Sequence, residues 1–261
     1  DVDVWKYPLP GDDSIFMIQR VVVHLGAEPK LVRLNMPPDP HRSTTSDHIA
    51  GRGGVFLDVQ WSRDSQDLAF VSSSRDHKVA QLRMADSETG EVRDVFAEKS
   101  ATYFESGFSD ANWRVLPSDN SFIWFSEKDN WGHLYLHDLS DGELKLKLTD
   151  GDWRVLDVVN LDYDQRQVYF TGSNLEAGDP YYQYLYRIGF DGGDLVNLTP
   201  ESANHSINWS ESKRYFVDSY STPIDAGAVV VKDISGAVVM ELETPDMSPL
   251  LDSGWVPPEQ I

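Results

Sequence analysis

A short segment at residues 101–114, ATYFESGFSDANWR, combines side chains that could recognise a peptide. It carries the carboxylate of Glu105, the guanidinium of Arg114 and the aromatic rings of Phe108 and Trp113. Aromatic rings cover apolar side chains well, and arginine binds carbonyl or carboxylate oxygens through hydrogen bonds. Alternatively, the rings pack between neighbouring sheets and Arg114 forms a surface ion pair with Glu105. Glu105, Phe108, Trp113 and Arg114 are therefore the candidate substrate-binding residues, with packing as the competing explanation.

Sequence motifs of known catalytic centres are missing from the chain. There is no G-x-S-x-G motif to present a serine nucleophile, no H-E-x-x-H, no phosphate-binding P-loop and no G-x-G-x-x-G. The chain also contains no cysteine, which removes thiolate nucleophiles, thiolate metal ligands and disulfides. We therefore expect neither a catalytic nucleophile nor a cofactor within these 261 residues.

The histidines and paired aspartates do not predict a metal site. Among seven histidines, only His133 and His137 are close in sequence, and on a strand they would lie about 13 Å apart, too far to share a metal ion. His133 is expected to bond the backbone of its own blade. The closely spaced aspartates fall in expected turns, where an aspartate side chain bonds the local backbone; they are Asp150 and Asp152, and Asp162 and Asp164.

The chain is strongly acidic, with 43 aspartates and glutamates against 22 lysines and arginines and a formal net charge of −21. Such a surface repels phosphate backbones, which argues against nucleic-acid binding. The charge serves solubility, or it attracts a cationic ligand such as a substrate with a free amine. No apolar run approaches the length of a membrane-spanning helix. The first residues lack the pattern of a secretory signal, so we expect a mature product or part of a longer chain.

Four segments repeat one pattern, a polar turn between two apolar runs. They are WSRDSQDLAFVS (61–72), LPSDNSFIWFSE (116–127), LDYDQRQVYFTG (161–172) and WSESKRYFVDSY (209–220). Equivalent positions, 55, 45 and 48 residues apart, are held by Asp64, Asp119, Asp164 and Ser212. Each segment continues with an apolar run, a turn (SETGE, SDGE, DGGD or SGA) and a last apolar run. A repeat of about 40–50 residues with four short strands is typical of a β-propeller blade.

The sequence therefore predicts an all-β fold of four-stranded antiparallel blades, with residues 1–261 forming one partial propeller domain. Strands are expected near 56–61, 67–73, 78–85 and 91–96, and again near 113–116, 121–126, 132–138 and 143–149. Residues 21–37 supply two strands of an incomplete blade, whereas 7–13 and 36–54 are expected to be long loops. Four full blades and a partial one could close a small ring or form an arc of a larger one.

Alternation along the strands predicts which aromatic side chains are buried. Trp124 falls on the apolar side of its strand, whereas Trp131 falls in the following turn and should be partly exposed. Tyr182, Tyr184 and Tyr186 share one face of a strand, where they are expected to fill the core rather than bind a ligand.

Several of these segments resemble the propeller of the dipeptidyl peptidase IV family of serine exopeptidases. The specific part is FIWFSEKDNWGHLYLHDL (122–139) followed by LTDGDWRVLDV (148–158). KYPLPGDDS (6–14) is similar to that family's Tyr-Pro-x-x-Gly loop, and residues 197–223 are also similar. The resemblance spans nearly the whole chain.

The resemblance implies an eight-bladed propeller seated over an α/β-hydrolase domain of the same polypeptide, in an enzyme that removes dipeptides from peptide N-termini. Two adjacent glutamates that hold the substrate amine are expected before residue 1, and the Ser-Asp-His triad after residue 261. The chain would then be a middle-to-late arc of the propeller, inactive alone, with peptide substrates as ligands. The family also implies a periplasmic or otherwise exported bacterial protein, and a homodimer is left open.

One position departs from the family pattern. The family has an aromatic residue followed by arginine on the substrate side, and here Phe108 is followed by Ser109. Two other functions stay open: a stand-alone propeller that binds proteins, and a small propeller enzyme with two carboxylates in its channel. A reading frame that continues into a domain with G-x-S-x-G would favour the dipeptidyl peptidase interpretation over these two alternatives.

Overall fold

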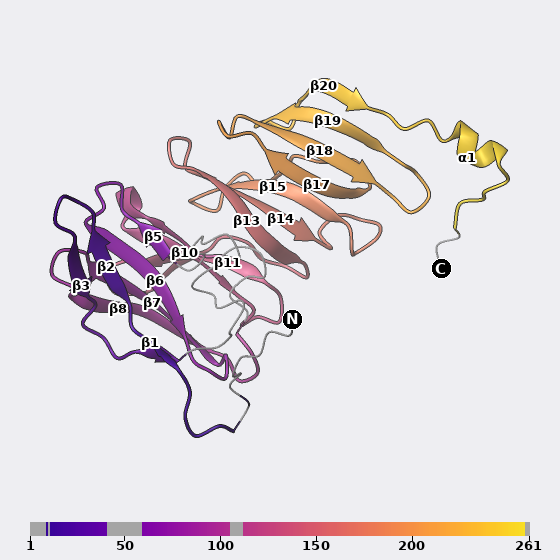
Figure 1. Cartoon of the computed structure of the whole chain (residues 1–261). Helices are drawn as coiled ribbons and strands as arrows, with labels where there is room; N and C mark the ends of the chain where they lie inside the picture. The colour runs from indigo at the N-terminus through magenta and orange to yellow at the C-terminus, as the bar shows by residue number, and fades with distance from the viewer. Residues whose placement is uncertain (1–8, 10, 41–58, 105–111, 259–261) are drawn as a thin grey trace, which may run out of the picture. The chain divides into compact units, whose positions relative to one another are not determined.

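The computed structural model describes residue 9 and residues 11–40, 59–104 and 112–258 (Figure 1). Strands account for 48% of the structure and helices for 4%, which confirms the all-β fold class. The helical elements are the single turn η1 (Pro117–Asp119) and the short α1 (Ser248–Asp252). Within the described ranges, no helix has the length and apolarity needed to cross a membrane.

Within the described residues, four sheets have four strands each, joined antiparallel in chain order, as in a propeller blade. The first contains β5 (Val59–Trp61), β6 (Asp67–Ser73), β7 (Val79–Asp86) and β8 (Val92–Lys99). The second contains β9 (Arg114–Leu116), β10 (Ser121–Ser126), β11 (His133–Asp138) and β12 (Leu144–Lys147). The third contains β13 (Arg154–Asp162), β14 (Gln167–Ser173), β15 (Gln183–Gly189) and β16 (Val196–Asn197). The fourth contains β17 (Asn204–Trp209), β18 (Tyr215–Ser221), β19 (Ala228–Asp233) and β20 (Val238–Glu243).

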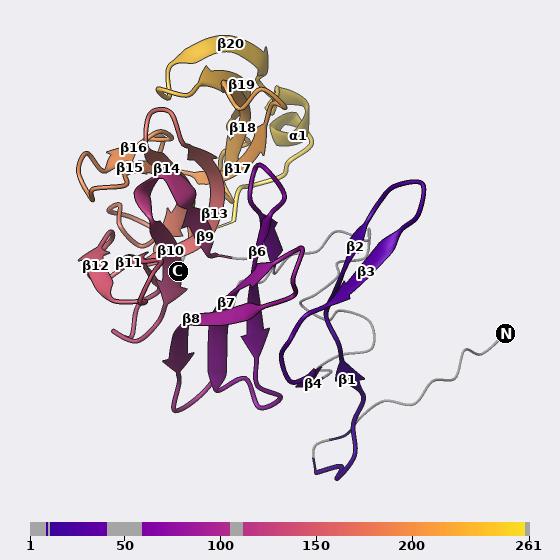
Figure 2. The ribbon, with the colours of Figure 1, turned by 90° about the vertical axis from the view of Figure 1, so that its left-hand side faces the viewer.

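Two further sheets have two strands each in the part of the chain that the structure describes. One is the hairpin of β2 (Val21–His24) and β3 (Lys30–Arg33), which is the incomplete blade expected from residues 21–37 (Figure 2). The other pairs β1 (Met17–Ile18) with β4 (Asp39–Pro40). The sequence did not predict β1 and β4, because two-residue strands carry no detectable alternation. The expected loop at 36–54 therefore includes a short strand at its start.

The turns explain why the repeat produces these sheets. In the first turn of each sheet one residue adopts a left-handed backbone with φ between 44° and 61°; these residues are Ser65, Asn120, Arg166 and Lys213. Asp162 shows how the aspartates act in such turns, because its Oδ1 accepts hydrogen bonds from the backbone amides of Asp164 and Gln165. The turn role expected for Asp162 is confirmed.

The chain divides into two compact units, residues 1–128 with 136–145, and residues 129–135 with 146–261. In the first unit, Trp124 is 2% exposed and its ring packs against Phe96 and Phe104, with centroid distances of 5.3 and 5.6 Å. Its indole N–H donates to Oε2 of Glu98 at 2.7 Å. Trp131 is partly exposed. Both tryptophan predictions are confirmed.

The second unit has its own aromatic core. Trp153 is buried and its ring lies 6.1 Å from that of Phe170 and 5.9 Å from that of Tyr186. Tyr169, Leu185, Leu198 and Phe216 form a neighbouring apolar cluster that joins the third and fourth sheets. Tyr182, Tyr184 and Tyr186 are all buried, as the alternation predicted.

Two buried histidines bond backbone carbonyl groups, and burial lowers the pKa of both. In the second unit, His133 Nε2 donates to the Gly151 carbonyl at 2.9 Å, and Nδ1 accepts from the Thr149 hydroxyl at 3.0 Å. In the first unit, His137 Nδ1 donates to the Gly142 carbonyl at 2.8 Å, while its ring stacks on Phe122 at 5.1 Å. Burial is the main cause that lowers the pKa of both histidines.

A lowered pKa in the folded state predicts that acid destabilises the protein. The unfolded histidine binds a proton as the pH falls below about 6.5, whereas the buried ring does not, so the free energy of unfolding falls from that pH downward. We expect His137→Gln to flatten this fall, because glutamine does not titrate. Urea unfolding between pH 7.5 and 5 measures both slopes. Identical slopes for the wild type and the variant would contradict the assignment.

Candidate functional site

The structure describes two of the four candidate substrate-binding residues. Glu105 and Phe108 lie outside the described residues. Trp113 is 5% exposed and belongs to the apolar core of the first unit. Arg114 begins β9 and is half-buried, with its guanidinium donating to the Trp113 carbonyl at 2.8 Å. A substrate-binding role for the four residues stays a prediction.

The position of Arg114 is fixed through its neighbour in β9. The Val115 amide donates to Oε1 of Gln60 at 2.8 Å, and Nε2 of Gln60 donates to the Val115 carbonyl at 2.9 Å. The side-chain amide of Gln60 thus pairs with β9 much as another strand would. β9 is thus bonded both to β10, where Arg114 pairs with Ile123, and to the side chain of Gln60.

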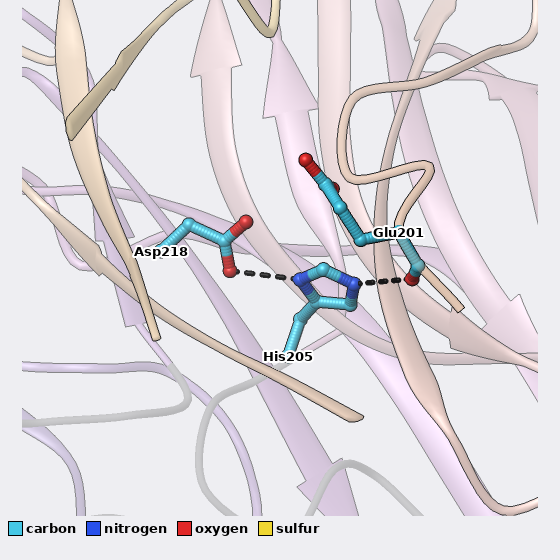
Figure 3. Close-up of side chains that lie close together, drawn as sticks. All are labelled: Glu201, His205 and Asp218. Atoms are coloured by element: carbon cyan, nitrogen blue, oxygen red, sulfur yellow. Dashed lines mark hydrogen bonds and ion pairs between the residues drawn. The ribbon is translucent and has the colours of Figure 1, made fainter. Parts of the chain in front are cut away.

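A buried cluster of charged side chains lies in the second unit, on one face of the fourth sheet (Figure 3). His205 in β17 pairs with Tyr220 in β18, so Asp218 lies two residues along on the same face. Lys232 in β19 pairs with Phe216, which again places it two residues from Asp218. Diagonal neighbours on one face of a sheet are within reach of long side chains. The strand register therefore brings these three residues together.

Glu201, in the connection before β17, completes the cluster. Lys232 Nζ donates to both carboxylate oxygens of Glu201, at 2.9 and 2.8 Å, and lies 3.0 Å from Oδ2 of Asp218. The contact with Asp218 is an ion pair whose angles fall short of a hydrogen bond. Oδ1 of Asp218 lies 2.8 Å from Nδ1 of His205. Nε2 of His205 lies 2.9 Å from the Glu201 carbonyl.

Glu201, His205 and Asp218 include the ligand types of a zinc site, but the arrangement does not fit a metal ion. The ammonium of Lys232 already stands between the two carboxylates, where a cation would bind. Both oxygens of Glu201 accept its hydrogen bonds. A metal would have to displace Lys232, whose side chain is 1% exposed. The cluster is therefore a closed ion-pair network rather than a metal centre.

The sequence does contain a feature that points to this cluster, although the cluster does not show the close spacing of a metal-ligand motif. Asp218 and Lys232 each interrupt an apolar strand, in RYFVDSYS and AVVVKDI, two residues after a buried apolar residue, Phe216 and Val230 respectively. A charged residue at a core-facing position needs a partner of opposite charge. Only the register shows which residue that partner is, because the members are 13 and 14 residues apart.

A second buried network lies in the first unit. Asp39, in β4, is 7% exposed and accepts hydrogen bonds from Nε of Arg20 and the Ser72 hydroxyl, both at 2.9 Å. Arg83 lies 3.5 Å from the other carboxylate oxygen and also donates to the Ser72 hydroxyl at 3.0 Å. This network attaches the β1–β4 pair to β6. As in the first cluster, the polar groups of this network form hydrogen bonds and ion pairs with one another.

Comparison with known proteins agrees with the resemblance seen in the sequence. A family model described as the N-terminal region of dipeptidyl peptidase IV matches residues 1–226. Dipeptidyl peptidase 4 of Arthroderma otae is 23% identical over 177 residues, which are 65% of this chain and 22% of that protein. The Trichophyton equinum protein of the same name is 25% identical over the same length and shares. The chain thus spans about a fifth of these relatives.

Solved structures show the same fold. The crystal structure of Porphyromonas gingivalis dipeptidyl peptidase 4 superposes with a TM-score of 0.62 at 16% identity. The match covers 86% of this chain and 29% of that one. A likeness at this identity concerns the fold, whereas the family match covers most of the sequence. The chain therefore belongs to the family defined by the N-terminal region of dipeptidyl peptidase IV.

Proposed function

We propose that this chain is the non-catalytic propeller portion of a dipeptidyl-peptidase-IV-like serine peptidase. It would narrow access to, and position peptide N-termini for, an α/β-hydrolase domain of the same polypeptide. The observation that carries the proposal is the family match over residues 1–226, in a sequence without a G-x-S-x-G motif. In both described buried networks the polar groups bond one another, as expected of groups that stabilise the fold.

The peptide-binding part of the proposal concerns the segment that ends at Arg114. Glu105, Phe108, Trp113 and Arg114 are proposed to contribute to the peptide-binding surface, with Trp113 supporting it from the core. Arg114 is half-buried and fixed by β9, which limits the orientations it can offer to a carbonyl or carboxylate group. The net charge of −21 favours peptides whose N-terminal amine is protonated.

The purified chain is expected to show no turnover of a dipeptidyl chromogenic substrate, because hydrolysis of this class needs a nucleophile activated by a positioned base. It is also expected to take no label from a serine-directed fluorophosphonate. A complete dipeptidyl peptidase 4, assayed in parallel, supplies the positive control for both readouts. Stoichiometric labelling of any serine in residues 1–261 would overturn the non-catalytic role.

The proposed hydrolase partner is tested at the level of the gene. We expect the reading frame after the codon for Ile261 to continue into a domain that contains G-x-S-x-G. A stop codon shortly after it would instead favour a stand-alone propeller that binds other proteins. This outcome would leave the family membership intact and remove the peptidase role.

A further inference from the structure

Both ring nitrogens of His205 face hydrogen-bond acceptors in a fully buried position. Nε2 lies 2.9 Å from the carbonyl oxygen of Glu201 and Nδ1 lies 2.8 Å from the carboxylate of Asp218. The side chains of His205 and Asp218 are both 0% exposed. We propose that His205 is a doubly protonated imidazolium in the folded chain, and that Glu201, His205, Asp218 and Lys232 form a charge-balanced latch; Figure 3 draws the first three of these residues.

The position of each proton follows from the acceptors. A carbonyl oxygen cannot donate, so the hydrogen between Glu201 and His205 is on Nε2. The second contact also needs one hydrogen, either on Nδ1 or on the carboxyl group of Asp218. A carboxyl group is far more acidic than an imidazolium, and Oδ2 of Asp218 forms an ion pair with the Lys232 ammonium at 3.0 Å. The hydrogen therefore stays on Nδ1.

The resulting charges cancel within the cluster. Lys232 and His205 contribute two positive charges, and Glu201 and Asp218 contribute two negative charges. Buried charges are tolerated when they are paired and hydrogen-bonded, and a neutral ring would leave two carboxylates facing one ammonium. A neutral ring would also leave the Nδ1 lone pair facing a carboxylate oxygen, which is repulsive.

Two tyrosine rings flank His205, and among the described residues the further charges that act on these tyrosines are Glu176 and Asp179 near Tyr184 and Glu241 near Tyr220. The rings beside His205 are those of Tyr184 on β15, at 5.5 Å, and Tyr220 on β18, at 5.3 Å. Burial is the main cause that raises the pKa of both phenols, so they are neutral near pH 7. Glu241 of β20 acts on Tyr220 at longer range. The imidazolium is thus paired by Asp218 and the Glu201 carbonyl.

The latch holds the connection before β17 as well as the strands β17, β18 and β19. Glu201 takes part twice, with its carbonyl accepting from His205 and its carboxylate accepting from Lys232. The same carbonyl accepts the Ala203 amide at 2.8 Å, which tightens the chain immediately before β17. Protonated His205 therefore holds the entry to β17 against β18 and β19. Loss of that proton would release the entry from β18.

Nitrogen-15 NMR of the wild-type chain at pH 7 tests the protonation state directly. Long-range correlation spectra distinguish protonated from unprotonated ring nitrogens, and the signals of His205 are assigned by their loss in His205→Gln. We expect both nitrogens of His205 to be protonated, whereas most exposed histidines at pH 7 are neutral. One unprotonated nitrogen on His205 would overturn the proposal.

Paired substitutions test the charge balance. Lys232→Met leaves two carboxylates with one imidazolium, while Asp218→Asn with Lys232→Met restores neutrality and keeps an acceptor for His205. We expect the double variant to unfold at a higher urea concentration than Lys232→Met alone. Lys213→Met, at an exposed position, is the matched control and should leave the midpoint unchanged. Additive losses for the two buried substitutions would show that their charges are not coupled, and would contradict the latch.

Discussion

Replacing Trp124 by alanine is expected to lower the free energy of unfolding of the first unit by about 3–5 kcal/mol. The side chain is 2% exposed, and Phe96, Phe104 and Phe122 surround its ring with centroid distances of 5.3 to 6.3 Å. Alanine would leave a cavity that these rings can fill only in part. Alanine would also remove the indole N–H that donates to the Glu98 carboxylate. That carboxylate would keep its hydrogen bond from the Ser126 hydroxyl, at 2.6 Å.

Urea unfolding followed by circular dichroism measures this loss. Trp124→Phe separates the two contributions, because it keeps a ring in the core and removes only the N–H group. Trp131→Ala is the control. Trp131 is partly exposed and lies in the turn between β10 and β11, so its replacement should lower the free energy of unfolding much less. A loss below about 1 kcal/mol for Trp124→Ala would mean that β10 does not present this side chain to the core.

Substitution of Gly227 by alanine is expected to cost at least about 2 kcal/mol, through backbone strain rather than lost packing. Gly227 precedes β19 with φ +65°, a region that side chains disfavour. A Cβ atom at this position would overlap the backbone carbonyl of Tyr220, so the hairpin between β18 and β19 would have to shift. The Gly227 amide, which donates to Oδ1 of Asp225 at 2.9 Å, would move with it.

Gly26→Ala provides the comparison for this prediction. A Cβ atom at Gly26 meets no atom within 4 Å, and its backbone is outside the left-handed region. Its effect should therefore be near zero or slightly stabilising, since alanine restricts the unfolded chain. Thermal unfolding of both variants gives the test. Equal melting temperatures for the two would contradict the strained turn.

The blades could be predicted from the sequence because the alternation of apolar residues and the positions of the turn residues indicate the same strands. Alternating apolar residues define β6, β10, β14 and β18, and turn residues fall at equivalent places in all four repeats. The β1–β4 pair could not be predicted, because its strands have two residues each and are held by Asp39 and Arg20 rather than by alternation. Tertiary contacts decide such short elements.

The cluster of Glu201, His205, Asp218 and Lys232 could not be predicted from the sequence for a related reason. A search for histidines and carboxylates at metal-ligand spacing examines neighbours in sequence, whereas His205 meets Asp218 through the pairing of β17 with β18. His133 and His137, four residues apart on β11, instead bond separate backbone carbonyl groups, those of Gly151 and Gly142. Knowledge of the hairpin register would have been enough to place Asp218 beside His205. The sequence feature that pointed to the cluster was a charged residue within each of two apolar strands, Asp218 in β18 and Lys232 in β19.

The tryptophans give the two units separate spectroscopic reporters. Trp113 and Trp124 are buried in the first unit, and Trp153 is buried in the second, where its indole N–H donates to the Asp150 carbonyl. The indole emission of each shifts when water reaches it. Variants that retain only Trp124 or only Trp153 would therefore show by fluorescence whether the units melt in a single cooperative step or one after the other.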